Sequence, residues 1–330
     1  MTRIAVVGAG VMGCAAAWAL SERGAEVTVH EQFELDHTHG SSHGRSRIFR
    51  VAYPEPYWIR YAQEAYVGWR DLERQSGQEL LGLYGLVELV ADAAMTSARS
   101  LDECGVEYSF LDAAAVRELG AVLPDGWTAL FAPEAGIVLA DRARHAFLEV
   151  SGARVETGSR VNSLDDLDAD VVVVTAGPWI GRLLPDVPVR VTRETLAYFR
   201  HDGPPPPSIV DLNPATGGHG MYSLYDPVHG LKAGAHHAGA SAEPDSDGAP
   251  DPAIVERISS WVRERFPDVD PEPVETDTCL YTSTADQTFV LDRRGRIVVG
   301  SACSGHGFKF APAVGRRLAA LAMAGLPMAE

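Results

Sequence analysis

The N-terminal glycines have the spacing of a nucleotide-binding turn. The sequence reads Gly8-x-Gly10-x-x-Gly13, and an acidic residue, Glu31, ends the second predicted strand. In such a turn the first glycine bends the chain, the second lets the backbone approach a pyrophosphate, and the third permits close helix packing. The helix N-terminus favours the phosphate charge, and the acid accepts hydrogen bonds from ribose hydroxyls. These residues alone do not distinguish FAD from NAD.

The two lysines are a second candidate for chemistry. Of the 28 basic residues, only Lys232 and Lys309 are lysines. A lysine ammonium is a compact charge whose pKa shifts readily on burial, although chance explains the count alone equally well. Lys309 lies in the glycine-rich segment 304–310, just before a predicted helix. Lys232 lies in an alternating strand, where it shares a face with His236.

The cysteines have no metal-like spacing. There are four of them: Cys14, Cys104, Cys279 and Cys303. Without a C-x-x-C pair they fit a reducing compartment, which predicts a cytoplasmic protein, and an isolated cysteine is most often a buried structural residue. His37, His39 and His43 can be read as a metal cluster, but their Gly/Ser loop lacks a carboxylate framework. We therefore predict no metal.

Short apolar segments indicate the elements that position these residues. Buried strands of the parallel type are predicted at 3–7, 25–30, 170–175 and 296–300, with helices from the glycine turn to Gly24 and over 312–325. Antiparallel-type strands are predicted at 84–90, 196–201 and 230–235, and surface loops at 202–207 and 239–252. The expected fold class is α/β, a Rossmann-like nucleotide-binding domain with an inserted, mostly antiparallel α+β substrate domain.

Composition excludes several classes of protein. The chain has 330 residues, 46% of them hydrophobic, and a formal charge of −17 with a pI near 5.0. This length suggests about two domains, and this charge argues against nucleic acid or an anionic membrane as a partner. An anionic substrate must therefore be met by a local basic pocket. The apolar run 4–20 is interrupted by glycines, which favours strand, turn and helix over a membrane span.

Further motifs follow the glycine turn in a characteristic order. They are GSSHGRSRIFR (40–50), GLKAGAH (230–236), CLYT (279–282) and SGHGFK (304–309). Together with the fingerprint, over nearly the whole chain, they resemble the monomeric sarcosine oxidase and N-methyltryptophan oxidase family of the D-amino-acid-oxidase-like flavoproteins. The resemblance implies FAD-dependent oxidation of a secondary amino acid, N-methyl or cyclic, to an imine. It also implies reduction of O2 to H2O2 and FAD held covalently through a cysteine thioether.

The resemblance gives the predicted organisation of the chain. An FAD-binding domain is expected from 1–80, 140–188 and 284–330, and a substrate domain from 81–139 and 189–283. The expected partners are a small amino-acid substrate and O2, with no nucleic acid and no membrane. The chain is expected to act as a monomer or a weak homo-oligomer.

The resemblance also implies roles for single residues. Cys279 is similar to the flavin-linking cysteine, and Lys232 to the lysine near flavin N5 where O2 is activated. The predicted catalytic residues are Lys232, His236, Arg47 and Tyr281. The predicted substrate-binding residues are Arg50 and Lys309, which resemble the carboxylate-binding pair, with Ser223 and Tyr222. The predicted cofactor-binding residues are Gly8, Gly10, Gly13, Glu31, Ser42, His43, Val161, Cys279, Gly305, Gly307, Phe308 and Lys309.

Four departures from the family pattern keep alternatives open. Ser223 stands where the family has a second consecutive tyrosine, so we expect it to replace a substrate-facing phenol. Arg45 replaces an acidic residue of the flavin-side loop. The segment 161–170 is shorter, and the chain ends at Glu330 without the usual extension. The alternatives are a biosynthetic imine-forming oxidase of a cyclic amino acid, a flavin-holding subunit of a larger assembly and, as a weaker one, a nicotinamide dehydrogenase.

Overall fold

A mostly parallel sheet positions the glycine turn. The structure, a computed structural model, describes residues 1–92, 94, 96–212 and 220–325. The sheet has the strand order β17-β18-β10-β1-β2-β9, and all strands except the edge strand β17 run parallel. Their bounds are β1 Arg3–Val7, β2 Glu26–His30, β9 Arg154–Glu156, β10 Val171–Val174, β17 Val290–Arg294 and β18 Ile297–Ser301. The four predicted parallel strands are thereby confirmed.

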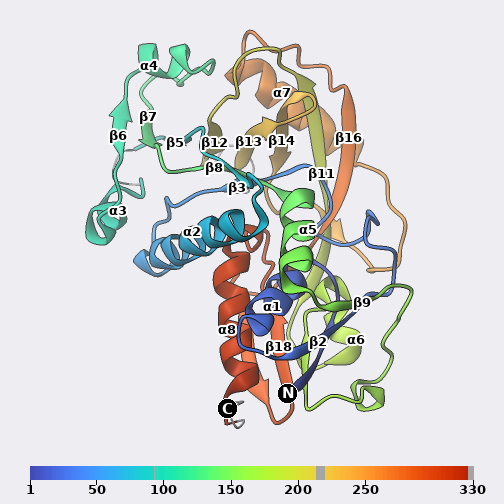
Figure 1. Ribbon diagram of the computed structural model, residues 1–330. Helices are drawn as coiled ribbons and strands as arrows, with labels where there is room; N and C mark the ends of the chain where they lie inside the picture. Colours follow the sequence, from blue (N-terminus) through green and yellow to red (C-terminus); the bar gives the residue numbers. More distant parts are fainter. Residues whose placement is uncertain (93, 95, 213–219, 326–330) are drawn as a thin grey trace.

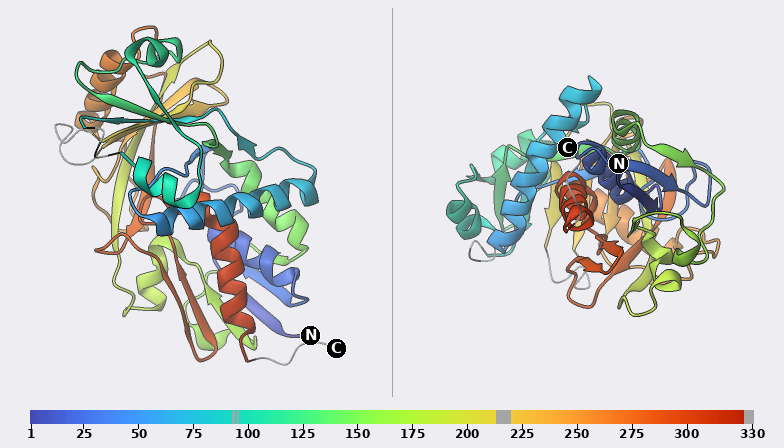
Figure 2. Two further views of the ribbon diagram at one scale, coloured as in Figure 1. Left: turned by 90° about the vertical axis from the view of Figure 1, so that its left-hand side faces the viewer. Right: turned by 60° about the horizontal axis from the view of Figure 1, so that its bottom comes forward.

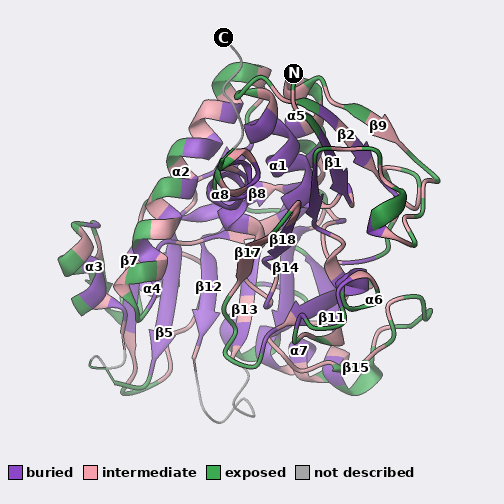
Figure 3. Cartoon of the chain, turned by 90° about the horizontal axis from the view of Figure 1, so that it is seen from below, coloured by how far each residue is buried: buried purple, intermediate pink, exposed green. Residues whose placement is uncertain are grey.

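Helices cover one face of this sheet (Figure 1). They are α1 (Val11–Ser21), α2 (Pro56–Ser76), α5 (Ala140–Ser151) and α8 (Ala311–Met323). Helix α1 is buried along almost its whole length, which explains why its sequence is apolar on every side. A Cβ on Gly315 of α8 would lie 2.4 Å from the carbonyl oxygen of Ala15, so glycine permits the close approach of α8 to α1. Figure 3 shows α1 buried, whereas α2 alternates buried and exposed residues.

Shorter elements cover the other face of the parallel sheet. They are η2 (Leu164–Asp166), η3 (Gly177–Trp179) and α6 (Ile180–Leu183). Ile180 and Leu184 pack there against the valines of β10 and against Val7. The segment directly after β10 therefore turns back over the carboxyl end of the sheet. Ligands of open parallel sheets bind at that end.

A second, larger sheet is mostly antiparallel. Its order is β15-β11-β14-β13-β12-β5-β7-β6, and β16 pairs with β11. Its strands are β5 Leu86–Val90, β6 Ser109–Leu111, β7 Thr128–Ala132, β11 Arg190–Arg200, β12 Ser208–Asp211, β13 Met221–Asp226, β14 Gly230–Ala235, β15 Ala240–Ser241 and β16 Glu275–Ser283. Helix α7 (Pro252–Arg265) packs on one face through Ile258, Trp261 and Val262. The other face is turned toward the parallel sheet (Figure 2).

The predicted antiparallel strands are present, 230–235 with its predicted bounds and the other two with shifted ends. Strand β5 begins at Leu86 because Gly85, at φ 88°, breaks the strand before it. Strand β11 begins at Arg190, six residues before the predicted start, because it pairs along its length with β16. The predicted loop 239–252 contains β15, which pairs with Thr192 and Arg193 of β11.

A small sheet of order β3-β8-β4 connects the two large ones. Its strands are β3 (Ser46–Phe49), β4 (Leu81–Gly82) and β8 (Gly136–Leu139), and the remaining helices are α3 (Ala98–Cys104) and α4 (Ala113–Glu118). Strand β3 belongs to one predicted domain, and β4 and β8 to the other. The domain boundaries therefore stay a prediction. No helix within the described ranges is long and apolar enough to span a bilayer.

Candidate active site

A cavity of about 1620 Å³ lies between the parallel sheet and the inner face of the antiparallel sheet. Pockets for one small ligand measure about 300–1,000 Å³, so this volume suits a large cofactor together with a substrate. Its basic lining residues are Arg47, Arg50, Arg144, Arg160, Arg182, Arg190, Lys232 and Lys309. A chain of net charge −17 thus encloses a basic pocket, as an anionic ligand requires.

The glycine turn and Glu31 form one end of the cavity. Gly8 has φ 100°, and a Cβ there would lie 2.7 Å from the carbonyl oxygen of Thr175. A Cβ on Gly13 would lie 1.9 Å from the carbonyl oxygen of Gly8, so Gly13 packs the turn and does not line the cavity. Gly10 does line it, and its nearest side-chain atom is Oγ of Ser42. Glu31 accepts hydrogen bonds from the backbone N–H groups of Ala9, at 2.8 Å, and Phe33, at 3.1 Å.

The remaining predicted cofactor contacts surround the same space. Ser42 Oγ accepts a hydrogen bond of 3.0 Å from the N–H of Val11, which fixes the loop 41–47 against the start of α1. Val161 also lines the cavity. Gly305, at φ 72°, leaves no room for a Cβ, which would lie 2.5 Å from the Tyr281 ring and 2.7 Å from His236. Gly307 and Phe308 continue this wall into η5 (Phe308–Phe310), which precedes α8.

Buried polar atoms around the cavity fit a polar cofactor such as FAD. Among the described residues, His43 Nε2, Thr282 Oγ1, Ser283 Oγ and His306 Nδ1 have no hydrogen-bond partner, and these four residues line the cavity. Buried donors and acceptors are normally paired, so such atoms point to a ligand that completes them. Together with the N-terminus of α1 and the glycine turn, they fit a dinucleotide cofactor.

Arg50 and Lys309, predicted to bind a carboxylate, meet on one aromatic ring. The guanidinium carbon of Arg50 lies 4.1 Å from the centre of the Tyr53 ring, and Nζ of Lys309 lies 5.8 Å from it. Lys309 also donates to the carbonyl oxygen of His306 at 2.6 Å. Burial and nearby Arg50 lower the pKa of Lys309 well below its ordinary value, so an incoming anion would restore its charge.

Lys232 lies beside Arg47. Its Nζ donates to the carbonyl oxygen of Ser46 at 3.1 Å, and Arg47 donates to the same oxygen at 2.9 Å. Burial and the charge of Arg47 lower the pKa of Lys232 to about 7. Arg47 also donates to the carbonyl oxygens of Ser41 and His43, which closes the loop 41–47 around its guanidinium group.

Two phenols and an imidazole complete the polar wall of the antiparallel sheet. Tyr281 Oη lies 3.5 Å from His236 Nδ1, and the rings of Tyr222 and His236 are edge to face at 6.5 Å. Burial raises the pKa of both tyrosines. Burial, with His237 and Arg50 nearby, lowers the pKa of His236 well below its ordinary value. All three groups are therefore neutral at neutral pH.

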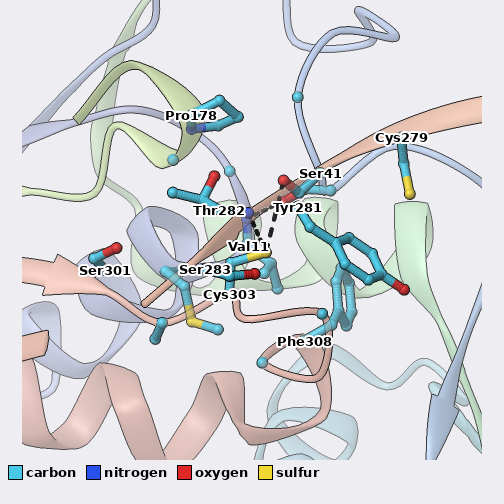
Figure 4. Close-up of a pocket in the computed structure, with 18 of the residues that line it drawn as sticks. Val11, Ser41, Pro178, Cys279, Tyr281, Thr282, Ser283, Ser301, Cys303 and Phe308 are labelled. Atoms are coloured by element: carbon cyan, nitrogen blue, oxygen red, sulfur yellow. Dashed lines mark hydrogen bonds between the residues drawn. The ribbon is translucent and has the colours of Figure 1, made fainter. Parts of the chain in front are cut away.

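Cys279 faces the cavity from β16. Figure 4 shows Cys279 and Tyr281 projecting from this strand toward the same side. Cys279 is 6% exposed and packs against Leu196 and Tyr281. Burial raises the pKa of its thiol to about 11, although Arg47 and Lys232 act in the opposite direction. Cys303 also lines the cavity and accepts a hydrogen bond from the N–H of Thr282 at 3.4 Å.

The prediction that Ser223 faces the substrate is wrong. Side chains alternate along β13, so Tyr222 and Leu224 face the cavity and Ser223 faces the opposite side. Ser223 pairs with Ala233 and Ile209, both of which belong to the core under α7. The side chain is fully buried there. A family position with two consecutive tyrosines can turn only one of them into the cavity.

Several cavity residues were absent from the sequence predictions. Thr175 and Trp179 follow the carboxyl end of β10, and the rule that ligands bind at that end of a parallel sheet could have identified them. Arg144 enters from α5, and its side chain is 3% exposed. No sequence signal marks Arg144, because its burial depends on how α5 packs. Within the described ranges, no three metal-ligating side chains are grouped to hold a metal ion.

Comparisons with known proteins agree on one family. The human protein named peroxisomal sarcosine oxidase is 32% identical over 355 residues, which cover 96% of this chain and 91% of that protein. The monomeric sarcosine oxidase of Bacillus sp. strain B-0618 is 27% identical over 359 residues, covering 98% and 92%. The solved structure of NikD, described as an unusual amino acid oxidase essential for nikkomycin biosynthesis, matches with a TM-score of 0.86 at 25% identity, covering 100% and 96%.

The family match extends over both large sheets. A sequence model described as FAD dependent oxidoreductase matches residues 3–321. The resemblance drawn from the ordered motifs is confirmed, and FAD, not NAD, is the cofactor of the matching family. The glycine turn, Glu31 and the unpaired polar atoms of the cavity are consistent with that cofactor. The chain belongs to the family of FAD-dependent oxidoreductases.

Proposed function

We propose that this protein oxidises a secondary amino acid, N-methyl or cyclic, to an imine, and that O2 accepts the electrons and leaves as H2O2. One observation carries the proposal. Arg50 and Lys309, two basic side chains suited to a carboxylate, share the Tyr53 ring and line the cavity that also contains Lys232. The sarcosine oxidases among the relatives support the same reaction class.

The chain's own residues bind and orient the substrate. The fork of Arg50 and the point charge of Lys309 hold a carboxylate at a fixed place. Tyr222, Tyr281 and His236, all neutral, line the substrate side of the cavity and add no positive charge that would repel the amine. The amine must lose its proton before it reacts, so the rate is expected to rise with pH. When bound, FAD would supply the redox chemistry between the C–H bond next to nitrogen and O2, and the chain's residues supply orientation and charge.

Lys232 is proposed to act on the oxygen side. A buried positive charge held by the Ser46 carbonyl stabilises negative charge that develops as O2 is reduced. Arg47 provides a second, permanent positive charge beside it. Gly8, Gly10, Glu31, Ser42, His43, Val161, Gly305, Gly307 and Phe308 are proposed to hold FAD, and Gly13 to permit the packing of the turn.

The proposal also covers the covalent attachment of the flavin, the cellular compartment and the partners. Cys279 is the proposed thioether ligand of the flavin, because its thiol faces the cavity beside Tyr281. The four cysteines are unpaired, as a reducing compartment such as the cytoplasm leaves them. A small amino acid and O2 are the proposed partners, and a monomer or weak homo-oligomer the proposed state.

The alternatives lose their support. The alternative of a biosynthetic oxidase depended on Ser223 altering the wall that faces the substrate. Ser223 instead lies under α7, on the other face of the sheet. The relatives cover the chain almost completely and include one named monomeric, which does not favour a flavin-holding subunit. A nicotinamide dehydrogenase disagrees with the family.

The test is anaerobic mixing of the holoenzyme with sarcosine, L-proline, L-pipecolate and N-methyl-L-tryptophan. Each is compared with a primary amino acid such as glycine. At least one secondary amine is expected to bleach the flavin absorbance. Admission of O2 should then restore the absorbance and release one H2O2 for each imine. Failure of every secondary amine, with FAD bound, would contradict the proposal.

A further inference from the structure

Arg45, a residue that departs from the family pattern, is held by two carboxylates. Its Nε donates to Asp226 at 2.9 Å and its guanidinium donates to Glu275 at 3.1 Å. The Asp226 side chain is fully buried and also accepts the N–H groups of Val228 and His229, at 3.2 and 2.8 Å. A buried carboxylate needs such partners to stay charged, and Arg45 supplies the cation.

Arg45 and Lys232 share two neighbours. Lys232 donates to the carbonyl oxygen of Ser46, the residue that follows Arg45. The guanidinium carbon of Arg45 lies 4.5 Å from the centre of the Tyr198 ring, and Nζ of Lys232 lies 5.5 Å from it. Tyr198 on β11 stands opposite Lys232 on β14 and opposite Glu275 on β16, so these side chains form one row across the sheet.

From these contacts we propose that Arg45 is a positioning residue for Lys232. Arg45 pairs with Asp226 and fixes the Ser46 carbonyl and the Tyr198 ring. It thereby sets the position of the Lys232 ammonium group and the electrostatic environment of that group. The importance of Lys232 for oxygen reduction rests on the proposed function, whereas its dependence on Arg45 does not.

The charges around Lys232 give the direction of the effect. The titratable and charged groups that face it are Arg47 and His43 from β3 and its preceding loop, Tyr198 from β11, Asp226 from β13, and Asp277 and Cys279 from β16. Asp226 favours the charged form of Lys232. If Arg45 is removed, the Asp226 carboxylate keeps the N–H donors of Val228 and His229 but has no arginine counter-charge, so it stabilises the ammonium form of Lys232 more strongly. If Asp226 is neutralised, the ammonium form loses stability.

Because the chain has two lysines, the pKa of Lys232 can be measured by NMR without enzyme turnover. Holoenzyme labelled with 13C at the lysine ε position has two lysine side-chain signals, and Lys232→Met assigns them. We expect Arg45→Met to raise the pKa of Lys232 by roughly one unit and Asp226→Asn to lower it. Arg45→Lys should remain near the wild type. Arg117→Met, which breaks an exposed ion pair with Asp268, should leave the titration unchanged.

General damage to the fold would move both variants in the same direction, so opposite shifts support the proposal. Equal shifts of the Lys232 pKa in the two variants, or an unchanged Lys232 pKa in either variant, would overturn the proposal. Asp226→Asn decides alone if Arg45→Met does not fold. A wild-type enzyme that oxidises no secondary amino acid would defeat the proposed function and leave this titration valid.

The holoenzyme gives a second readout. The rate at which O2 reoxidises the reduced flavin should fall as Lys232 loses its proton. The midpoint of that pH profile should move up in Arg45→Met and down in Asp226→Asn, as in the NMR titration. A midpoint fixed at the wild-type position in both variants would overturn the positioning role.

Discussion

The guanidinium carbon of Arg50 lies 4.1 Å from the centre of the Tyr53 ring. Tyr53 is 4% exposed, so the contact lies in the core beside the cavity. Lys309 approaches the same ring. Contacts with an aromatic ring hold a basic side chain in place, so we infer that Tyr53 positions Arg50 and Lys309 for the proposed carboxylate.

Arg50→Ala should weaken binding of simple carboxylate inhibitors. A lost hydrogen bond to a charged group costs about 2 kcal/mol, which corresponds to roughly thirtyfold weaker binding. Arg50→Lys should recover part of this loss, because the charge returns without the fork. Titration of the flavin spectrum with acetate or a heterocyclic carboxylate measures the affinity.

The matched control for Arg50 is Arg60→Ala. Arg60 lies on α2, where its exposed side chain pairs with Glu103. Inhibitor affinity should not change in this variant. If Arg50→Ala also kept the wild-type affinity, Arg50 would not bind the carboxylate.

The Cys279 thiol should link FAD slowly at neutral pH and faster in alkali. The thioether would replace a C–H bond of the flavin 8α methyl group by a C–S bond, with loss of the proton and of two electrons, which O2 would accept through the flavin. The attacking species is the thiolate, and burial raises the pKa of this thiol to about 11. Apoprotein reconstituted with FAD should therefore retain more flavin after acid precipitation as pH rises toward that value. Cys279→Ser should release all flavin into the supernatant.

Cys303→Ser is the control for attachment, since Cys303 also lines the cavity. It should retain flavin like the wild type. Flavin retained by Cys279→Ser and lost by Cys303→Ser would assign the link to the other thiol.

The elements that were predicted correctly depend on local sequence. The glycine spacing and the buried run 3–7 specify strand, turn and helix without information from distant residues. The face of Ser223 depends on which side of β13 meets α7, and alternation alone does not determine that. The partners of Arg45 are likewise supplied by β13 and β16, far along the chain. Such contacts follow from packing and register, which a single sequence does not specify.

His43 should make the protein less stable in mild acid. Burial, with Arg47 and Lys232 nearby, lowers the pKa of His43 to about 3, below its ordinary value of 6.5. Below pH 6.5 the unfolded chain therefore binds a proton that the folded chain does not. Between pH 7 and pH 5 this costs about 2 kcal/mol of unfolding free energy. In His43→Asn, thermal unfolding should show a smaller loss between those pH values.

Val67→Ala is the control for this pH effect, because Val67 is an exposed side chain of α2 that has no titratable group. Its loss of stability between pH 7 and pH 5 should match that of the wild type. Equal pH dependence in His43→Asn and the wild type would show that His43 is protonated in the folded state.

Ser223→Ala should leave substrate affinity unchanged and should not lower stability. Among the described residues, the Ser223 hydroxyl has no hydrogen-bond partner, and its side chain is fully buried. Removing an unpaired buried hydroxyl relieves a desolvation cost of about 1 kcal/mol, so the unfolding temperature should rise slightly or stay equal. Ser223→Tyr should destabilise the fold by about 1–3 kcal/mol, because the phenol would enter the packed layer under α7.

Tyr222→Phe is the matched variant on the opposite face of β13. Its hydroxyl faces the cavity near His236 and Tyr281, so its loss should change KM or inhibitor affinity while the unfolding temperature stays nearly constant. If Ser223→Ala changed KM and Tyr222→Phe did not, the register of β13 would differ by one residue from this structure. A one-residue shift exchanges every side chain between the two faces, so these two substitutions test the register directly.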